Sequence, residues 1–289
     1  MNHSMINAAV SIQALQQKLD LVSNNIANTN TTGYKRKEAS FQDVLTSVRQ
    51  QPQGFAREGR MTPLGYNYGW GAKLVQAELN MAQGTLKETN NPLDLAIHGA
   101  GLFEIAAVML NENDEPVQQI RWTRDGSFKL GVDPEDPESM FLLTKDGHFV
   151  LNDGSEPMRI PANHRIQVRE DGMIMAYDDA DEFAEPVEVG QLKLVRAVRP
   201  QLLEQLGDNL YTLPADITPE IRETILQTVN EDNNAIDPIT VQQGYLEQSN
   251  VVLADELTEL SMVQRAYQLN SRALASADQM LGLANSLRG

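Results

Sequence analysis

"SNNIANTNTTGYK" (Ser23–Lys35) closes the amino-terminal part of this 289-residue chain. It holds four Asn and three Thr residues and ends on a glycine, an aromatic and a basic residue. Short amide and hydroxyl side chains of this kind bond to backbone groups where a helix ends. They can cap their own helix or bond to another chain, and the sequence leaves both open.

Apolar side chains lead into this stretch at heptad spacing. Two series, seven residues apart within each, form an a/d seam over three heptads: Met5, Ile12, Leu19 and Ile26, with Ala8, Leu15 and Val22. Gly33 is the first position at which such a helix could stop. The pattern predicts a helix over residues 1–35. An isolated helix of this length is marginal in water, so its apolar stripe requires a partner.

A second heptad pattern ends the chain and supplies that partner. Its members are Leu246, Leu253, Leu260, Tyr267, Leu274 and Leu281, with companions Val263, Asn270, Ala277 and Ala284. Polar Glu256 interrupts the companion series, and Ser249-Asn250 is the predicted amino-terminal cap. We predict a helix over residues 241–289 that pairs with the first as an antiparallel coiled coil. The alternative is that each helix only covers the globular centre.

The middle of the chain has a different pattern. Short apolar runs alternate with Asp-Gly dipeptides, typical of hairpin turns, at residues 125–126, 146–147, 153–154 and 171–172. The pattern predicts a hairpin-rich, all-β domain within residues 91–240, ending in an irregular connector over 214–238. Residues 36–90 form a connecting segment, in which the Gly-, Pro- and aromatic-rich stretch 46–72 fits neither helix nor regular sheet. The predicted fold class is α+β.

Composition excludes several classes of partner. The formal net charge of −17 disfavours nucleic acid and an anionic membrane surface. The negative charge is concentrated in the middle, and the two ends are nearly neutral. No cysteine is present, and no run of 18 apolar residues occurs, so we expect no membrane insertion. The first residues lack the pattern of a secretory signal.

Motifs for catalysis are also missing. The four histidines, His3, His98, His148 and His164, form no metal-binding spacing. The sequence contains no phosphate loop, dinucleotide fingerprint or nucleophile elbow. We therefore predict no catalytic, cofactor or metal site, and an interaction protein. Two rival hypotheses are a wall-cutting hydrolase that uses paired carboxylates and a soluble binding module that forms a homodimer.

Four blocks of sequence resemble the bacterial flagellar axial family, which comprises rod, hook and hook–filament junction proteins. They are residues 23–35, 82–105 ("AQGTLKETNNPLDLAIHGAGLFEI"), 121–130 ("RWTRDGSFKL") and 244–281, which includes Gln264 and Arg265. Length and the "QRAY" block are most similar to the basal-body rod proteins of the distal-rod type. A proximal-rod or hook-type subunit is the alternative.

The resemblance implies a structural subunit that polymerises into a hollow helical drive shaft around an export channel. It implies rod and hook proteins and the flagellar type III export apparatus as partners, and a location in the cell envelope outside the cytoplasmic membrane. "FQDVL" (Phe41 to Leu45) is similar to an element of early export substrates. The family-motif residues are Asn24, Asn25, Asn28, Gly33, Tyr34, Gln264 and Arg265. We expect Asn24, Asn25, Asn28 and Asn30 to contact neighbouring subunits, or else to cap their own helix.

Overall fold

The computed structural model describes residues 2–43, 46–50, 65–69, 72–110, 116–133, 136–178, 185–207, 209–214, 217–229, 234 and 238–287. The chain forms two compact units, each assembled from separate segments. The helical unit comprises residues 1–27, 37–78 and 252–289, and the β unit comprises residues 28–36 and 79–251.

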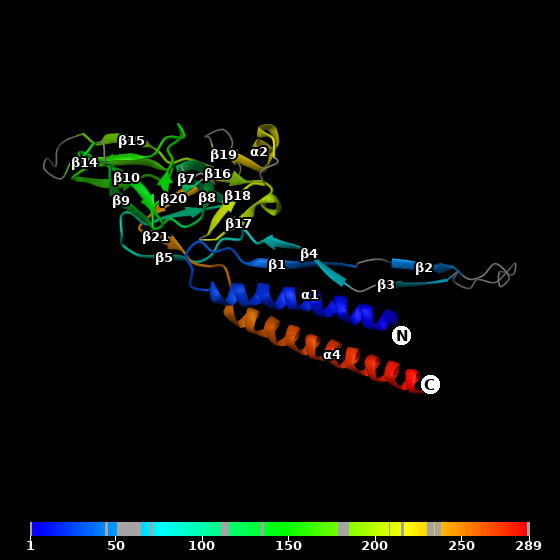
Figure 1. The fold of residues 1–289 in the computed structure, drawn as a ribbon. Helices are drawn as coiled ribbons and strands as arrows, with labels where there is room; N and C mark the ends of the chain where they lie inside the picture. The colour runs from blue at the N-terminus through cyan, green and yellow to red at the C-terminus, as the bar shows by residue number, and fades with distance from the viewer. Residues whose placement is uncertain are drawn as a thin grey trace. The chain divides into compact units, whose positions relative to one another are not determined.

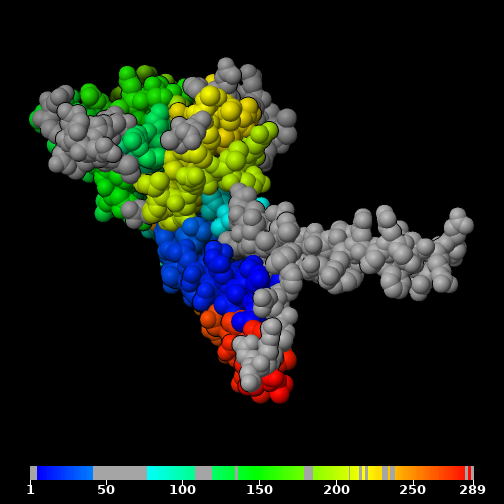
Figure 2. All heavy atoms as spheres, turned by 45° about the vertical axis from the view of Figure 1, so that its right-hand side comes forward, coloured from blue at the N-terminus to red at the C-terminus, as the bar shows by residue number. Residues whose placement is uncertain are grey.

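Two long helices dominate the helical unit. Helix α1 (Asn2–Ala27) and helix α4 (Leu253–Ser286) lie side by side (Figure 1 and Figure 2). Lys18 pairs with Glu259 at 2.6 Å, while Gln16 donates to Tyr267 at 3.4 Å, so positions fall along α1 as they rise along α4. The helices are therefore antiparallel, which confirms the predicted α+β class with paired terminal helices. Neither they nor any other described helix is long and apolar enough to span a membrane.

Both helices are shorter than predicted. Helix α1 ends at Ala27, where Asn and Thr side chains compete with helical backbone bonds, as when Asn28 Oδ1 accepts from Thr31 Oγ1 at 3.1 Å. At the other end Leu246 lies in strand β21 (Tyr245–Glu247), opposite Lys87 of strand β5 (Leu86–Glu88). The prediction that Leu246 belongs to the helical seam is wrong, because backbone pairing holds it in a sheet.

The helical unit also contains strands. Strand β1 (Lys37–Asp43) pairs with β4 (Ala72–Leu79), and β2 (Thr46–Gln50) pairs antiparallel with β3 (Gly65–Gly69). The prediction that residues 46–72 avoid regular sheet is wrong for β2 and β3. Alternating aromatic residues in β3 favour a strand, whereas most of the Gly and Pro residues fall between the two strands, at positions outside the described residues.

The β unit is built from short strands that pair antiparallel. Besides β5 and β21 they are β6 (Leu95–His98), β7 (Gly101–Leu110), β8 (Pro116–Thr123), β9 (Phe128–Val132), β10 (Ser139–Thr144), β11 (Phe149–Val150), β12 (Arg159–Pro161), β13 (His164–Val168), β14 (Met173–Asp178), β15 (Val187–Gln191), β16 (Leu194–Ala197), β17 (Glu204–Leu206), β18 (Leu210–Thr212), β19 (Leu226–Thr228) and β20 (Thr240–Gln243). The largest sheet follows the order β12-β10-β11-β7-β8-β18-β17, with β9, β16 and β19 paired at its side. Strands β13 to β15 form a second sheet, and β20-β6 and β21-β5 are separate pairs.

The core of the β unit lies on both faces of strand β7. Phe103 and Ile105 point into one buried apolar cluster, while Leu102 packs with Trp122 and Tyr211 in another. This alternation follows from the two-residue period of a strand. Because both faces of β7 are covered, "GLFEIAA" appears in the sequence as an almost continuous apolar run.

Two details of the predicted β domain need correction. The predicted connector 214–238 contains helix α2 (Pro219–Ile225) and strand β19, whose Leu226 is buried in the core. Gly147 and Gly172 occupy hairpin turns with φ of 86° and 84°, as predicted. Asp125-Gly126 does not close a hairpin, because β8 pairs with β7 and β18 while β9 pairs with β10.

Candidate functional site, a buried polar clasp

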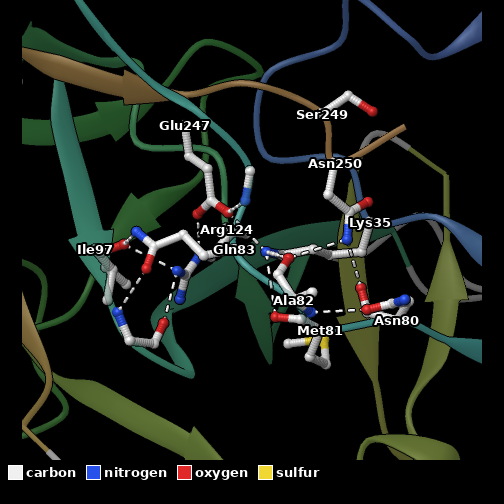
Figure 3. A network of polar contacts seen from close by, with 12 residues as sticks. Lys35, Asn80, Met81, Ala82, Gln83, Ile97, Arg124, Glu247, Ser249 and Asn250 are labelled. Atoms are coloured by element: carbon white, nitrogen blue, oxygen red, sulfur yellow. Dashed lines mark hydrogen bonds and ion pairs between the residues drawn. The ribbon is translucent and has the colours of Figure 1, made fainter. Parts of the chain in front are cut away.

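A buried carboxylate organises one end of the β unit. Glu247, the last residue of β21, accepts hydrogen bonds at Oε1 from Lys35 Nζ (2.7 Å) and from the backbone N–H of Gly84 (2.8 Å). Its Oε2 accepts from Arg124 Nε (Figure 3). The side chains of all three ions are 1% exposed. We call these residues, together with Asn250 and the backbone of residues 33–36, 80–84 and 97–101 to which they bond, the clasp.

Arg124 extends the clasp to the turn between β6 and β7. Its Nη2 donates to the carbonyl oxygens of Ile97 (2.8 Å) and Gly99 (2.7 Å), and its Nη1 donates to that of Gly101. A buried guanidinium needs such acceptors, because its donors lose their hydration on folding. Arg124 thus fixes the path of a turn as well as balancing the charge of Glu247.

Asn250 joins two further segments. Its Oδ1 accepts from the backbone N–H of Arg36 at 2.7 Å, and its Nδ2 donates to the carbonyls of Asn80 (2.8 Å) and Ala82 (2.9 Å). Lys35 Nζ also donates to Ala82 at 2.9 Å. The predicted role of Asn250 as a helix cap is wrong, because both ends of its amide bond to other segments of the β unit. Figure 3 shows Asn250 beside Asn80 and Ala82, to which it donates.

Gly33 brings the end of the opening stretch against the clasp. Its N–H donates to the carbonyl of Glu247 at 2.8 Å, and its φ is +68°. A Cβ atom here would lie 2.7 Å from the backbone carbon of Arg124. Gly33 therefore does not stop a helix but permits a close backbone approach that a larger residue would block. The next residue, Tyr34, is buried.

The charges of the clasp depend on one another. Burial, and then the positive charge of Arg124, lowers the pKa of Lys35 to about 8, although Glu247 acts in the opposite direction. Burial alone would raise the pKa of Glu247. Arg124, Lys35 and the hydrogen bonds from Lys35 and Gly84 together outweigh it, so that pKa lies below its ordinary value. Near neutral pH the clasp is thus an ionised carboxylate between two cations.

The clasp collects all four motif blocks. Gly33 and Lys35 come from the first, Gly84 and Ile97 from the second, Arg124 from the third and Glu247 from the fourth. The blocks carry the family resemblance, but sequence reasoning missed Lys35, Arg124 and Glu247 as a group. No local signal pointed to the group, because only Lys35 is the sole charge of its block: "RWTRDGSFKL" also holds Arg121, Asp125 and Lys129, and the block of Glu247 holds further charges.

The helical unit has a smaller buried polar contact. Asn25 is 1% exposed, and its Nδ2 donates to the carbonyl of Lys37 (3.0 Å) and to Glu256 Oε2 (3.2 Å). Its Oδ1 accepts from the Lys37 N–H at 3.0 Å. Asn25 therefore neither faces a neighbouring subunit nor caps α1. Glu256, which we expected to interrupt the seam, is fully buried within it.

The predicted seam residues lie on the packed faces of the two helices, with one exception besides Leu246. Val22 and Val263 are buried and Leu253 is exposed, whereas the others are half-buried: Met5, Ile12, Leu15, Leu19, Ile26, Leu260, Tyr267, Leu274 and Leu281. Asn24 and Asn30 are exposed, as are Gln264 and Arg265 on α4. The ring of Phe41 lies 5.4 Å from Lys18 Nζ, and Leu45 lies outside the described residues.

No described group of three or more His, Asp or Glu side chains could hold a metal ion. The charged side chains of the clasp are buried, and its polar side chains form their hydrogen bonds and ion pairs with other groups of the protein. The clasp therefore has a structural role.

Two families of known proteins match the parts of this chain that contain the first and the fourth motif block. A family described as "Flagella basal body rod protein" matches residues 6–35, and one described as "Flagellar basal body rod FlgEFG protein C-terminal" matches residues 242–287. The flagellar basal-body rod protein FlgG of Borreliella burgdorferi is 32% identical over 100% of this chain and 99% of its own length. The flagellar hook-basal body complex protein FlhP of Bacillus subtilis is 32% identical over the whole of both chains.

The chain belongs to the flagellar basal-body rod protein family. It is a FlgG-like rod subunit of the distal-rod type, a structural component rather than an enzyme. FlgG of Caulobacter vibrioides is also 32% identical, over 97% of each chain. The clasp is therefore a structural feature of a rod protein.

Proposed function

We propose that the chain polymerises through its paired helices into the distal rod, a hollow helical shaft that transmits torque and surrounds an export channel. The observation that carries this is full-length similarity to rod proteins in a chain whose two ends pair as one helical unit. Its partners are other copies of itself and the neighbouring rod and hook proteins. The chain reaches them through the flagellar type III export apparatus, for which Phe41 to Leu45 is a candidate signal.

The clasp suits the mechanical part of this role. Residues 28–36 and 79–251 make up the β unit, so the chain enters or leaves it at residues 28, 36, 79 and 251, and the last three of these lie in the clasp or next to it. Arg36, Asn80 and Asn250 are hydrogen-bonded to one another at these ends. A force applied along the chain reaches the clasp before it reaches the sheets. We infer that the clasp holds the ends of the β unit together under torque.

Electron microscopy of basal bodies from a strain that lacks the gene tests the rod assignment. We expect missing or shortened rods and no hooks, with rods restored by a plasmid copy. Complete rods and hooks would overturn the proposal. The similarity to FlhP, a hook-basal body complex protein, favours one second candidate, a rod-to-hook or proximal position. In that case the rods in the strain that lacks the gene would end at a different position along the basal body than expected for a distal-rod subunit.

A further inference from the structure

Two cations of the clasp share one carboxylate that comes late in the chain. Lys35 and Arg124 are both buried, and Glu247 is the only carboxylate in the described part of the chain that pairs with either of them. Glu247 follows Lys35 by 212 residues and Arg124 by 123 residues. Since the β unit ends at residue 251, one of its last residues completes its internal charge balance.

Glu247 and Asn250 also supply acceptors to two other segments of the β unit. The N–H of Gly33 donates to the carbonyl of Glu247, and the N–H of Arg36 donates to Asn250 Oδ1. The N–H of Gly84 donates to Glu247 Oε1. The first two donors belong to the segment 28–36 and the third to the segment that begins at residue 79. Both segments therefore depend on acceptors from the end of the unit.

Without residues 245–251, the rest of the β unit would enclose charges that have lost their counter-ion. Lys35 Nζ would keep its bond to the carbonyl of Ala82, and Arg124 would keep its carbonyl partners, but neither would have an ion pair. Strand β5 would also lose β21, the strand with which it pairs. A buried charge that loses its partner costs a large part of the free energy that keeps a domain folded. We therefore expect the β unit to be unstable without this segment, although every strand of its largest sheet lies outside it.

We propose that Glu247 and Asn250 act as a latch, which delays folding of the β unit until the fourth motif block is available. Synthesis delivers Lys35 early and Glu247 late, and passage through the proposed export channel with the amino terminus first has the same order. A narrow channel admits an unfolded chain and excludes a folded β unit, so the latch keeps the chain in a form that can be exported. This use in export rests on the proposed function, whereas the dependence of folding on the latch does not.

Native-state hydrogen exchange of the full-length chain in low concentrations of urea, resolved by residue, tests the dependence. The hydrogen-bonded N–H groups of Gly33 and Gln248 report opening at the latch, and those of Glu104 and Leu151 report opening of the largest sheet. If the latch cannot open alone, all four exchange through one opening of the whole unit. Their opening constants should then agree within about threefold and share one urea dependence. The N–H of Ser155, in an exposed turn, is the control for local opening.

Asn250→Ala removes three hydrogen bonds of the latch and leaves its charges in place. We expect exchange at all four N–H groups to accelerate by the same factor, about tenfold or more. Gln248→Ala is the matched control, because that side chain is exposed and bonds to Thr85, and we expect a change of about twofold or less.

Local opening of the latch would overturn the inference. Its sign is fast exchange at Gly33 and Gln248 while Glu104 and Leu151 stay protected, in the wild type or in Asn250→Ala. The β unit would then persist without its last segment, and the proposed function would be unaffected. Complete rods and hooks in the strain that lacks the gene would instead refute the proposed function and leave the order of folding in place.

Discussion

The clasp and helix α4 differ in the kind of side chain that each one buries. In the clasp, charged side chains are buried, yet each has partners within the same chain, as Lys35, Arg124 and Glu247 show. Along α4, apolar side chains such as Leu269 remain in solvent although the helix is long and regular. One region contradicts the rule that charge lies outside, and the other contradicts the rule that apolar groups lie inside.

The difference indicates which region is complete in a single copy. A buried ion pair is tolerated only when its geometry is fixed and its remaining hydrogen bonds are made, and the clasp meets both conditions. An apolar helix face gains most of its stabilisation from burial, which exposed residues of α4 such as Met262, Leu269 and Leu283 lack in one copy. The clasp therefore stabilises the fold of a single copy, whereas the exposed apolar face of α4 can be buried only when copies assemble. Substitutions in either region can break this comparison or sharpen it.

The largest effect is expected from Arg124→Met. Glu247 would keep its burial but lose one of its two cations, and the carbonyl groups of Ile97, Gly99 and Gly101 would lose the hydrogen bonds that Arg124 donates. Removing one partner of a buried pair costs about 3–5 kcal/mol. Urea unfolding followed by circular dichroism measures the loss. Arg222→Met is the control, because its side chain is 41% exposed and 4.0 Å from Glu104, and we expect about 1 kcal/mol or less. Equal losses of unfolding free energy for the two variants would show that the clasp stabilises the fold no more than an exposed ion pair does.

Gly33→Ala is expected to have the next largest effect. The new Cβ would meet backbone atoms of Arg124 and Asp125 at 2.7 Å, in addition to the strain of a positive φ. Gly147→Ala separates the two effects, because its φ is also positive but no atom would lie within 4 Å of its added Cβ. We expect about 1 kcal/mol for Gly147→Ala and about 3 kcal/mol for Gly33→Ala in thermal unfolding. A smaller loss for Gly33→Ala would show that the close approach is not rigid.

The helices and strands with a regular spacing of apolar residues could be predicted from local sequence patterns. The seam positions of α1 and α4, the run that became β7 and the turns at Gly147 and Gly172 follow from spacing and backbone preference alone. The ends of the helices were not predictable in this way. Leu246 continues the heptad in register, but its backbone pairs with Lys87, a residue far away in the chain. Periodicity contains no information about such a competitor.

The clasp was visible only as separate motifs. Lys35, Arg124 and Glu247 are far apart in sequence, and each taken alone has the prior of a solvated surface charge. Their meeting depends on long-range pairing of β5 with β21 and on the turn after β6. Asn25 illustrates the same limit, because its partners Lys37 and Glu256 lie on different elements. Burial that arises from such tertiary contacts leaves no local pattern from which a single sequence could predict it.

Acid should weaken the clasp in a defined pH window. The folded-state pKa of Glu247 is lower than its ordinary value of 4.5. Its contribution to stability is therefore complete above about pH 4.5 and is lost as the pH falls through the lower, folded-state pKa. Glu247→Gln cannot titrate, so the stability difference between wild type and this variant should shrink in acid. A constant difference from about pH 7 to about pH 3 would contradict the ionised clasp.

The smallest effect on the isolated subunit is expected on the exposed side of α4, at Leu269. Leu269 is 65% exposed, so Leu269→Asp should change the melting temperature of the monomer little, by the equivalent of about 0.5 kcal/mol or less. Val263, at 4% exposure in the seam, provides the contrast: Val263→Asp places a charge between α1 and α4 and should separate them even in the monomer. Both variants should fail to restore motility in a strain that lacks the gene, but for different reasons. Calorimetry of the purified chains distinguishes these reasons, because only Val263→Asp loses the transition of the helical unit. If Leu269→Asp also lost it, Leu269 would already be buried within one copy. The contrast between a clasp that is complete in one copy and a helix α4 that is not would then fail.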